Sequence, residues 1–426
     1  MTSKNILFND GWSFTLCAPK TKLSELPEKK WYNVELPHDW LVGDTTRLYE
    51  TGEGWYRRTL SCSEEMLSGR VLLNFDGVYF NSTVFVNGKE AGSWTYGYSA
   101  FEIDITDHLH EGDNEILVRV LHESPNTRWY SGAGIYRDVM LKLRPLTYIR
   151  TNGVYIHSEP MTNGPWKTEV EADIVGESAD IRMTLEVFDP FGVSTSGCSL
   201  EAHFDGGLET FSTSFVNTHP ELWNTQDPML YTLVICLYRG DELLDCLSET
   251  FGYRKTDFLP DKGFLLNGEP LKMHGVCMHH DLGALGSAMN VTALSRQLRI
   301  MKEMGVNAIR TSHNMPARQL LQLCDEMGLL VDCEAFDMWE KPKTEFDNHR
   351  FFVEHAERDV RSWIERDRNH PCVIMWSIGN EINDTIDPHG LDITKRLYDY
   401  VLKYDPKGNA PATIGSNYMG DQNAQK

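Results

Sequence analysis

Hydrophobic and polar positions alternate in short segments over the first 145 residues. Such segments cover residues 70–75, 82–87, 115–120 and 138–143, and the second one runs into Asn87-Gly88. A period of two is typical of half-buried strands, and Asn-Gly between two such runs is a strong hairpin signal. The pattern predicts an antiparallel β-sandwich, a jelly roll, over residues 1–145.

The same alternation continues after Arg144-Pro145, where we place a domain boundary. It is clearest over residues 181–188 and 230–238. Roughly 100 residues of short strands, with turns every 8–12 residues, have the size and rhythm of an immunoglobulin-like sandwich. We therefore expect a second β-sandwich over residues 146–256.

The period changes from two to 3.6 in residues 257–426. Strand-like apolar runs at residues 271–276, 307–311, 329–334 and 372–377 alternate with amphipathic helical segments. One of these segments begins at Pro316 and ends at Gly328. The inward helix faces that we expect are Val291, Leu294, Leu298 and Met301; Leu320, Cys324 and Met327; Val353, Ala356, Val360 and Trp363; and Ile393, Leu397 and Val401.

Alternating strands and helices imply a parallel sheet joined by right-handed crossovers. Both a doubly wound sheet and a (β/α)8 barrel have this pattern, and periodicity alone does not decide between them. In either fold, functional groups gather beyond the carboxyl ends of the strands.

Composition and charge narrow the class of function. The 426 residues carry a formal net charge of −22, with 41% hydrophobic and 24% charged residues. This balance is typical of globular domains, and the negative charge disfavours binding to nucleic acid or anionic membranes. The start lacks the apolar core of a signal peptide, and no apolar run reaches membrane-spanning length. We expect a soluble cytoplasmic protein that acts on a neutral small molecule.

The cysteines predict a reducing compartment. There are nine, scattered through apolar contexts, and no Cys-x-x-Cys pair occurs. Buried free thiols are therefore expected, and neither a zinc site nor a disulfide framework is.

Polar and aromatic residues follow all four predicted parallel strands. They are His279, His280 and Asp281; Arg310, Thr311, Ser312, His313 and Asn314; Glu334, Asp337 and Trp339; and Gly379, Asn380 and Glu381. Any one of them could be a capping or ion-pairing group. Four strand ends that agree are better explained by a functional pocket.

Glu381 is the candidate for acid/base cleavage of a glycosidic bond. It follows an apolar run that contains Trp376, and such a setting favours the protonated carboxyl that a general acid needs. The reaction also needs a second carboxylate across the anomeric carbon. Asn380 supplies an amide for a sugar hydroxyl.

Metal-assisted hydrolysis is the alternative that these strand ends leave open. His279, His280, Asp281, His313 and Glu334 are all of residue types that bind metals. The His-x-His layout of a binuclear barrel hydrolase is absent, so we expect no metal and no cofactor.

Several phrases together resemble glycoside hydrolase family 2, and within it the bacterial β-galactosidase-like members. They are Leu36-Pro37-His38-Asp39-Trp40, Gly54-Trp55-Tyr56-Arg57, Ser131-Gly132-Ala133-Gly134-Ile135-Tyr136-Arg137, Thr311-Ser312-His313, Asn369-His370-Pro371 and Trp376-Ser377-Ile378-Gly379-Asn380-Glu381. The resemblance spans all three segments. It implies a jelly-roll sugar-binding domain, an immunoglobulin-like domain and a (β/α)8 TIM barrel, with retention of anomeric configuration.

The resemblance also implies roles for single residues. Glu381 matches the general acid/base, and Asn380 matches the asparagine that contacts the sugar 2-hydroxyl. Asp281 and His313 match positions that hold other hydroxyls, and Arg310 matches an arginine near the nucleophile. Beyond these five, Trp339 is expected to be a platform for a pyranose ring, and Arg128 with Trp129 to bring the first domain to the pocket rim.

Residues 257–426 are too short for a whole barrel of about 250 residues, so only the first half is expected. The resemblance places the nucleophilic glutamate beyond Lys426, and Glu334 comes too early to be it. We therefore expect a fragment of a β-galactosidase that is inactive alone. For the full-length enzyme, a homo-oligomer is one of the assemblies that the resemblance allows.

The substrate prediction is a terminal β-galactoside or a related glycoside. β-Glucuronidase and β-mannosidase are the nearest alternatives, and a glucuronidase would show Ala where this chain has Gly379. A non-catalytic carbohydrate-binding protein is the alternative from another class, with Trp94, Tyr96, Tyr98 and Trp129 as candidate stacking surfaces.

Overall fold

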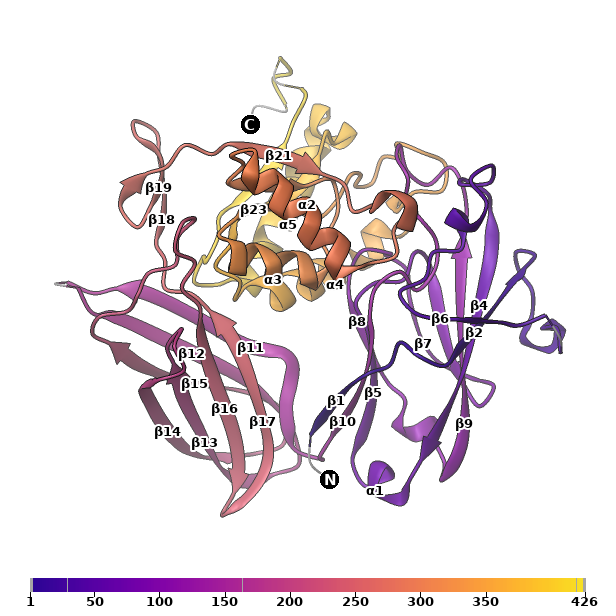
Figure 1. Ribbon diagram of the computed structural model, residues 1–426, viewed down its shortest axis with the longest axis horizontal. Coiled ribbons are helices and arrows are strands. Elements are labelled where there is room, and N and C mark those ends of the chain that lie inside the picture. The colour runs from indigo at the N-terminus through magenta and orange to yellow at the C-terminus, as the bar shows by residue number, and fades with distance from the viewer. Residues whose placement is uncertain (1–2, 29, 163, 419, 424–426) are drawn as a thin grey trace.

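The computed structural model describes residues 3–28, 30–162, 164–418 and 420–423. Two β-sandwiches lie side by side, and an α/β unit packs against both of them (Figure 1). This order along the chain confirms the predicted fold class.

The first sandwich consists of two antiparallel sheets, with strand orders β1-β10-β5-β8 and β3-β2-β4-β9-β6-β7. Its core contains Trp12, Tyr56, Leu73, Phe75 and Val118, all buried. The strands are β1 Lys4–Leu7, β2 Trp12–Cys17, β3 Tyr32–Val34, β4 Gly52–Cys62, β5 Arg70–Phe75, β6 Ser82–Val86, β7 Lys89–Trp94, β8 Phe101–Asp104, β9 Gly112–His122 and β10 Val139–Arg144.

The predicted hairpin lies between β6 and β7. Asn87 has φ 51° and Gly88 has φ 77°. Two consecutive residues in the left-handed region form the turn that matches the twist of paired strands. The Asn-Gly prediction is confirmed.

The second sandwich has sheets of order β11-β12-β15 and β14-β13-β16-β17. Alternate residues of its strands, such as Val170, Leu185 and Ile235, fill the core between the sheets. The strands are β11 Tyr148–Pro160, β12 Trp166–Gly176, β13 Ala179–Phe188, β14 Ser194–Phe204, β15 Gly207–Asn217, β16 Tyr231–Arg239 and β17 Glu242–Phe251.

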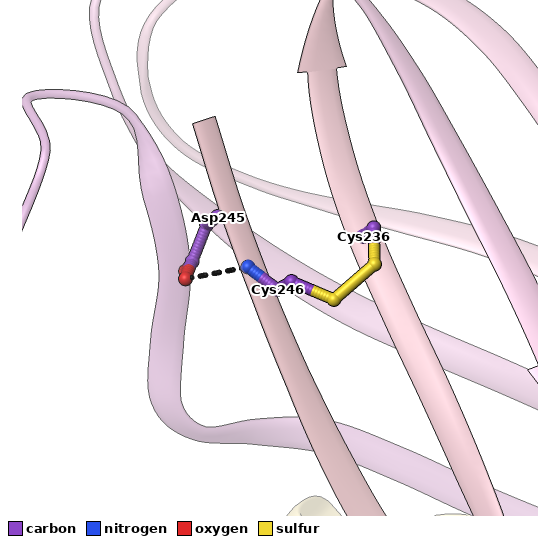
Figure 2. The surroundings of a disulfide bond; sticks show 3 residues. All are labelled: Cys236, Asp245 and Cys246. Carbon is purple, nitrogen blue, oxygen red and sulfur yellow. Dashed lines mark hydrogen bonds between the residues drawn. A yellow bond between two sulfur atoms is a disulfide. The ribbon is translucent and has the colours of Figure 1, made fainter. Parts of the chain in front are cut away.

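A disulfide joins two neighbouring strands of this sandwich. Cys236 on β16 pairs in register with Cys246 on β17, and their sulfurs are bonded (Figure 2). The Cys246 N–H donates to Asp245 Oδ1 at 2.9 Å. The expectation of free thiols alone was therefore wrong, and the cytoplasmic location loses the support that it drew from the cysteines.

The α/β unit contains a parallel sheet of five strands in sequential order, β21-β22-β23-β24-β25. Consecutive strands in sequence order, each followed by a helix, form successive βα units of a TIM barrel that closes with eight strands. A small antiparallel sheet, β18-β19-β20, precedes it. The strands are β18 Thr256–Leu259, β19 Gly263–Leu266, β20 Glu269–Pro270, β21 Gly275–Met278, β22 Ala308–Thr311, β23 Leu330–Glu334, β24 Val373–Asn380 and β25 Ala412–Gly415.

The four long helices follow the expected pattern. They are α2 Val291–Glu303, α3 Arg318–Met327, α4 His349–Asp367 and α5 Pro388–Tyr404. Gly328 ends α3 with φ 68°, as predicted. Val291 and Val353 were expected to point inward but are 48% and 67% exposed, while Ala356, Val360 and Trp363 are buried. In the described part of the chain, no helix is both long and apolar enough to cross a membrane.

Arg137 fastens the first sandwich to the α/β unit. Its buried guanidinium donates to the carbonyl oxygens of Tyr98 at 3.0 Å, Pro316 at 3.1 Å and Met315 at 2.8 Å. Asp76 adds an ion pair to Arg366 of α4 at 3.1 Å. A cavity of about 1050 Å³ lies between the three units and includes Lys142, Cys246 and Arg318 in its lining.

Candidate active site

Glu381 lies directly after the carboxyl end of β24. Its backbone has φ 47°, and its N–H donates to Gly415 O of β25 at 2.6 Å. The side chain is 39% exposed, and its Oε2 accepts from Arg128 Nη1 at 3.1 Å. Arg128 belongs to the segment between β9 and β10 of the first sandwich. The expected contribution of the first domain to this pocket is therefore a direct contact with the candidate acid/base.

Asp337 connects the residues around Glu381. Its Oδ1 accepts from Arg128 Nη2 at 2.9 Å, Lys343 Nζ at 2.8 Å and Asn380 Nδ2 at 2.8 Å. Lys343 also donates to the backbone oxygen of Asn380 at 2.7 Å, which orients the peptide that leads into Glu381. Burial lowers the pKa of Lys343, and Asp337 opposes that shift.

Glu334 forms a second charged centre at the end of β23. It is fully buried and accepts from Arg310 Nη2 at 2.7 Å and Ser377 Oγ at 2.6 Å, and it pairs with His313 Nδ1 at 2.6 Å. Arg310 Nη2 also donates to Asn380 Oδ1 at 2.8 Å. Both ends of the Asn380 amide are thus fixed, one by Arg310 and the other by Asp337.

Asp332 lies one layer deeper on the same strand. Its Oδ2 is 3.8 Å from Arg310 Nε, and burial raises its pKa to about 7, with Glu334 adding to the shift. Two carboxyl groups on the barrel-facing side of β23, those of Asp332 and Glu334, therefore interact with the same arginine, Arg310.

Three rings form one wall of the pocket. Trp129 from the first sandwich lies 5.0 Å from His279 and 5.3 Å from His313, and the two imidazoles are 5.4 Å apart, all between ring centroids. His280 points away from this wall, with Nε2 3.0 Å from the carbonyl oxygen of Ser131. Asp281 follows at the end of β21, half-buried.

Trp339 does not offer a ring face for stacking. It is fully buried, and its Nε1 donates to Ile378 O at 2.9 Å. We correct its expected role as a pyranose platform, because its faces are covered by protein. Tyr96 and Tyr98 are buried in the same way and offer no stacking surface.

Trp376 does not provide the apolar setting that was expected for Glu381. Its indole lies on the helix-facing side of the sheet, 5.0 Å from the Trp363 ring, and its Nε1 donates to Asp405 Oδ2 at 3.0 Å. Side chains alternate across a strand, so residues 376 and 377 point to opposite faces. The groups nearest to Glu381 are charged ones instead.

The metal-ligand alternative has no geometric support in the residues that the structure describes. The group with converging ligand atoms there is Asp325, His370 and Cys372, which shares no residue with the strand-end set. His313 and Glu334 are already bonded to each other, and Glu334 also to Arg310.

Sequence reasoning found most of the residues in this pocket, and it missed two roles. Glu381, Asn380, Arg310, His313 and Arg128 belong to one network of hydrogen bonds. Asp337 stood out only as one of several polar residues at a strand end. Lys343 was not singled out, because it follows Lys341-Pro342 in a loop that has no periodicity.

The arrangement provides a partly exposed carboxyl group beside fixed amide and cationic donors. These groups can exchange a proton with a ligand and hold its hydroxyls. Three family models match the chain: the sugar binding domain of glycosyl hydrolases family 2 over residues 12–145, a further domain of that family over 147–254, and its TIM barrel domain over 259–410. The chain belongs to glycosyl hydrolase family 2.

Its relatives carry more than one activity in their names. The chain is 40% identical to the β-galactosidase BoGH2A of Bacteroides ovatus over 88% of its own length and 46% of the relative's. It is 34% identical to a putative β-glucuronidase of Formosa agariphila over 92% of its length and 38% of the relative's. The chain thus spans about half the length, or less, of these relatives.

The fold is similar to that of solved family members. A glycosyl hydrolase family 2 member from Bacteroides cellulosilyticus superposes with a TM-score of 0.94 at 31% identity, over 99% of this chain and 57% of that one. A β-glycosidase from Bacteroides vulgatus gives a TM-score of 0.88 at 33% identity, over 97% of this chain and 54% of that one.

Proposed function

We propose that this chain carries the acid/base half of a retaining exo-β-glycosidase that hydrolyses terminal β-galactosides. The observation that carries the proposal is the contact network in which Arg128, Asp337 and Asn380 surround Glu381. A strand-end carboxyl with a fixed amide beside it is the arrangement that protonation of a glycosidic oxygen needs.

In this proposal Glu381 protonates the leaving oxygen and later takes a proton from the attacking water. Asn380, whose amide is held by Arg310 and Asp337, contacts the sugar 2-hydroxyl. His313 and Asp281 hold other hydroxyls. Arg128 approaches from the leaving-group side and keeps Glu381 in place.

Retention requires a nucleophilic carboxylate about 5–5.5 Å from the acid/base. Glu334 and Asp337 are the buried carboxylates nearest to Glu381 in the network, and each accepts donors from three side chains. Both carboxylates are thus engaged in positioning the neighbouring side chains, among them Arg310, His313 and Lys343. We therefore propose that the nucleophile lies outside these 426 residues and that the chain does not turn over substrate alone.

The preference for galactose is supported by the more similar of the two relatives described above, a β-galactosidase at 40% identity. Gly379 before Asn380 also departs from the Ala expected of a glucuronidase. β-Glucuronides and β-mannosides are the alternatives within the family.

Ligand binding tests the glycone without requiring turnover. We expect a galactose-configured isofagomine to raise the melting temperature of the chain more than its glucuronic-acid-configured counterpart does, and Asn380→Ala to abolish the shift. If the glucuronic-acid-configured compound raises the melting temperature more, the preferred glycone is glucuronic acid and the proposal of galactose is wrong.

Hydrolysis of nitrophenyl β-galactoside tests the catalytic assignment. The chain alone should show none, and a longer protein that contains it should lose hydrolysis when Glu381→Gln is introduced. The matched control is Glu340→Gln, whose carboxylate pairs with Arg396 and His389 instead. If the chain alone hydrolyses the substrate and Glu381→Gln abolishes that hydrolysis, the proposal that the nucleophile lies outside these 426 residues is wrong.

A further inference from the structure

A small pocket lies behind the pocket wall, between the ends of β21 and β22 and the helices α2 and α3. Its volume is about 30 Å³. The strand ends supply His280 and Ser312, and α2 supplies Gln297. Met289 and Met315 belong to the apolar part of the lining.

Five polar atoms of side chains that line this pocket are buried without a hydrogen-bond partner among the described residues. They are His279 Nδ1, His280 Nδ1, Gln297 Oε1, Ser312 Oγ and Asn314 Nδ2. Buried polar groups are nearly always hydrogen-bonded to protein or to ordered water. Five such atoms around one pocket therefore call for a shared partner.

The chemistry of four of the five atoms defines that partner. His280 Nε2 faces the carbonyl oxygen of Ser131, which only accepts, so Nε2 carries the hydrogen. Burial lowers the pKa of His280 to about 4, so the ring is neutral at pH 7 and Nδ1 is an acceptor. Gln297 Oε1 is an acceptor, Asn314 Nδ2 is a donor, and the Ser312 hydroxyl is both.

We propose that ordered water occupies this pocket and bridges His280, Gln297, Ser312 and Asn314. Water both donates and accepts, so it matches the two acceptors, the donor and the hydroxyl, and it suits His279 Nδ1 in either tautomer. One water molecule needs roughly 10–15 Å³ of such a volume, so the pocket of about 30 Å³ has room for about two.

Other occupants fit the polar atoms less well. A cation would face the Asn314 amide hydrogens, and an apolar molecule would leave all five polar atoms unpaired. Water also tolerates either orientation of the Asn314 amide, because it donates as readily as it accepts.

The bridge gives the water a positioning role at the active-site rim. It donates to His280 Nδ1, while Nε2 of the same ring lies 3.0 Å from the carbonyl oxygen of Ser131 in the first sandwich, the contact that sets the tautomer. Ser131 lies three residues from Arg128 on the same segment. On the other side, Ser312 directly precedes His313. The proposal rests on these contacts alone and is independent of the substrate.

Water-to-methyl cross-relaxation tests the proposal in solution, in the whole chain with ¹³C-methyl methionine. We expect cross-peaks between water and the methyl groups of Met289 and Met315. Met183, buried in the core of the second sandwich, is the negative control. No water cross-peak at Met289 and Met315 would overturn the proposal.

Two variants separate water from the serine hydroxyl, which exchanges with solvent. With Ser312→Ala the cross-peaks should persist, whereas their loss would assign them to the hydroxyl and overturn the proposal. Gln297→Met removes one acceptor and, unlike Ser312→Ala, puts an apolar side chain of similar size against the water, so it should weaken them at least fivefold. Gln322→Met, exposed on α3, should leave them unchanged. Equal intensities in the two glutamine variants would also count against the bridge.

Discussion

Arg128 and Glu381 are 253 residues apart in the sequence, yet Arg128 Nη1 lies 3.1 Å from Glu381 Oε2. The contact joins the first β-sandwich to the end of a strand in the α/β unit. The candidate acid/base is therefore held by two domains at once.

Arg128→Met should change the free energy of unfolding little. Both partners of the Arg128–Glu381 pair are more than a third exposed, and such pairs contribute about 1 kcal/mol or less. Arg128 also pairs with the buried Asp337, but that carboxylate keeps Lys343 and Asn380 as donors in the variant. Urea denaturation, with the exposed Arg47→Met as control, measures the difference. A loss above about 3 kcal/mol would instead make Arg128 a structural clamp.

Asp337→Asn should be much more damaging than Arg128→Met. It leaves the Lys343 ammonium, 6% exposed, without its buried carboxylate. Breaking a buried ion pair costs about 3 kcal/mol or more. Lys343→Met added to Asp337→Asn should recover part of that loss, because no uncompensated charge is left. Strictly additive effects in the double-mutant cycle would contradict this coupling.

His280 should make the folded state less stable in acid. Its pKa is lowered to about 4 by burial, against an unfolded value near 6.5. The unfolded state binds the proton more tightly, so the contribution of the neutral ring is complete above pH 6.5. It falls as the pH drops toward 4, by about 3 kcal/mol in all.

The measurement compares urea unfolding at pH 7 and pH 4.5 in wild type and His280→Gln. The variant should lose less stability between the two pH values than wild type does. His110→Gln, at an exposed position, should follow wild type. Parallel losses in all three proteins would exclude His280 as the titrating group.

The disulfide predicts a thiol count. The denatured, unreduced chain should titrate seven thiols, since nine cysteines include the bonded pair Cys236–Cys246. After reduction it should titrate nine. Replacing both cysteines by serine should lower the free energy of unfolding by about 2–3 kcal/mol, the value for a short closed loop. Nine thiols before reduction would show that the bond does not form.

Local patterns predicted most of the fold. The Asn87-Gly88 hairpin and the end of α3 at Gly328 need only the conformational freedom of single residues, so the sequence indicates them directly. The first parallel strand was expected over residues 271–276 but lies at Gly275–Met278. Its position is set by pairing with β22, where Gly275 lies opposite Ala308, and an apolar run does not show where such pairing starts.

Candidate site residues could be predicted from the sequence where they lie at the end of a strand. They could not be predicted where their role depends on partners that are far away along the chain. Asn380 is the last residue of β24, and Glu381 follows it directly. Asp337 and Lys343 act through partners that only the folded chain brings together. The disulfide was missed for the same reason, because strand register alone places Cys236 opposite Cys246. Trp376 lies close to Glu381 along the chain, but that closeness does not show which side of the sheet its indole takes.

Arg137 has a consequence for protein engineering. Its guanidinium is bonded to carbonyl oxygens of both the first sandwich and the α/β unit. Exchanging the first domain for that of a distant relative would have to preserve this arginine and the backbone path of Met315 and Pro316. The domains of this chain are separate in topology but are not interchangeable parts, and an α/β unit produced without the first domain would lose the Arg137 donor to the Met315 carbonyl oxygen.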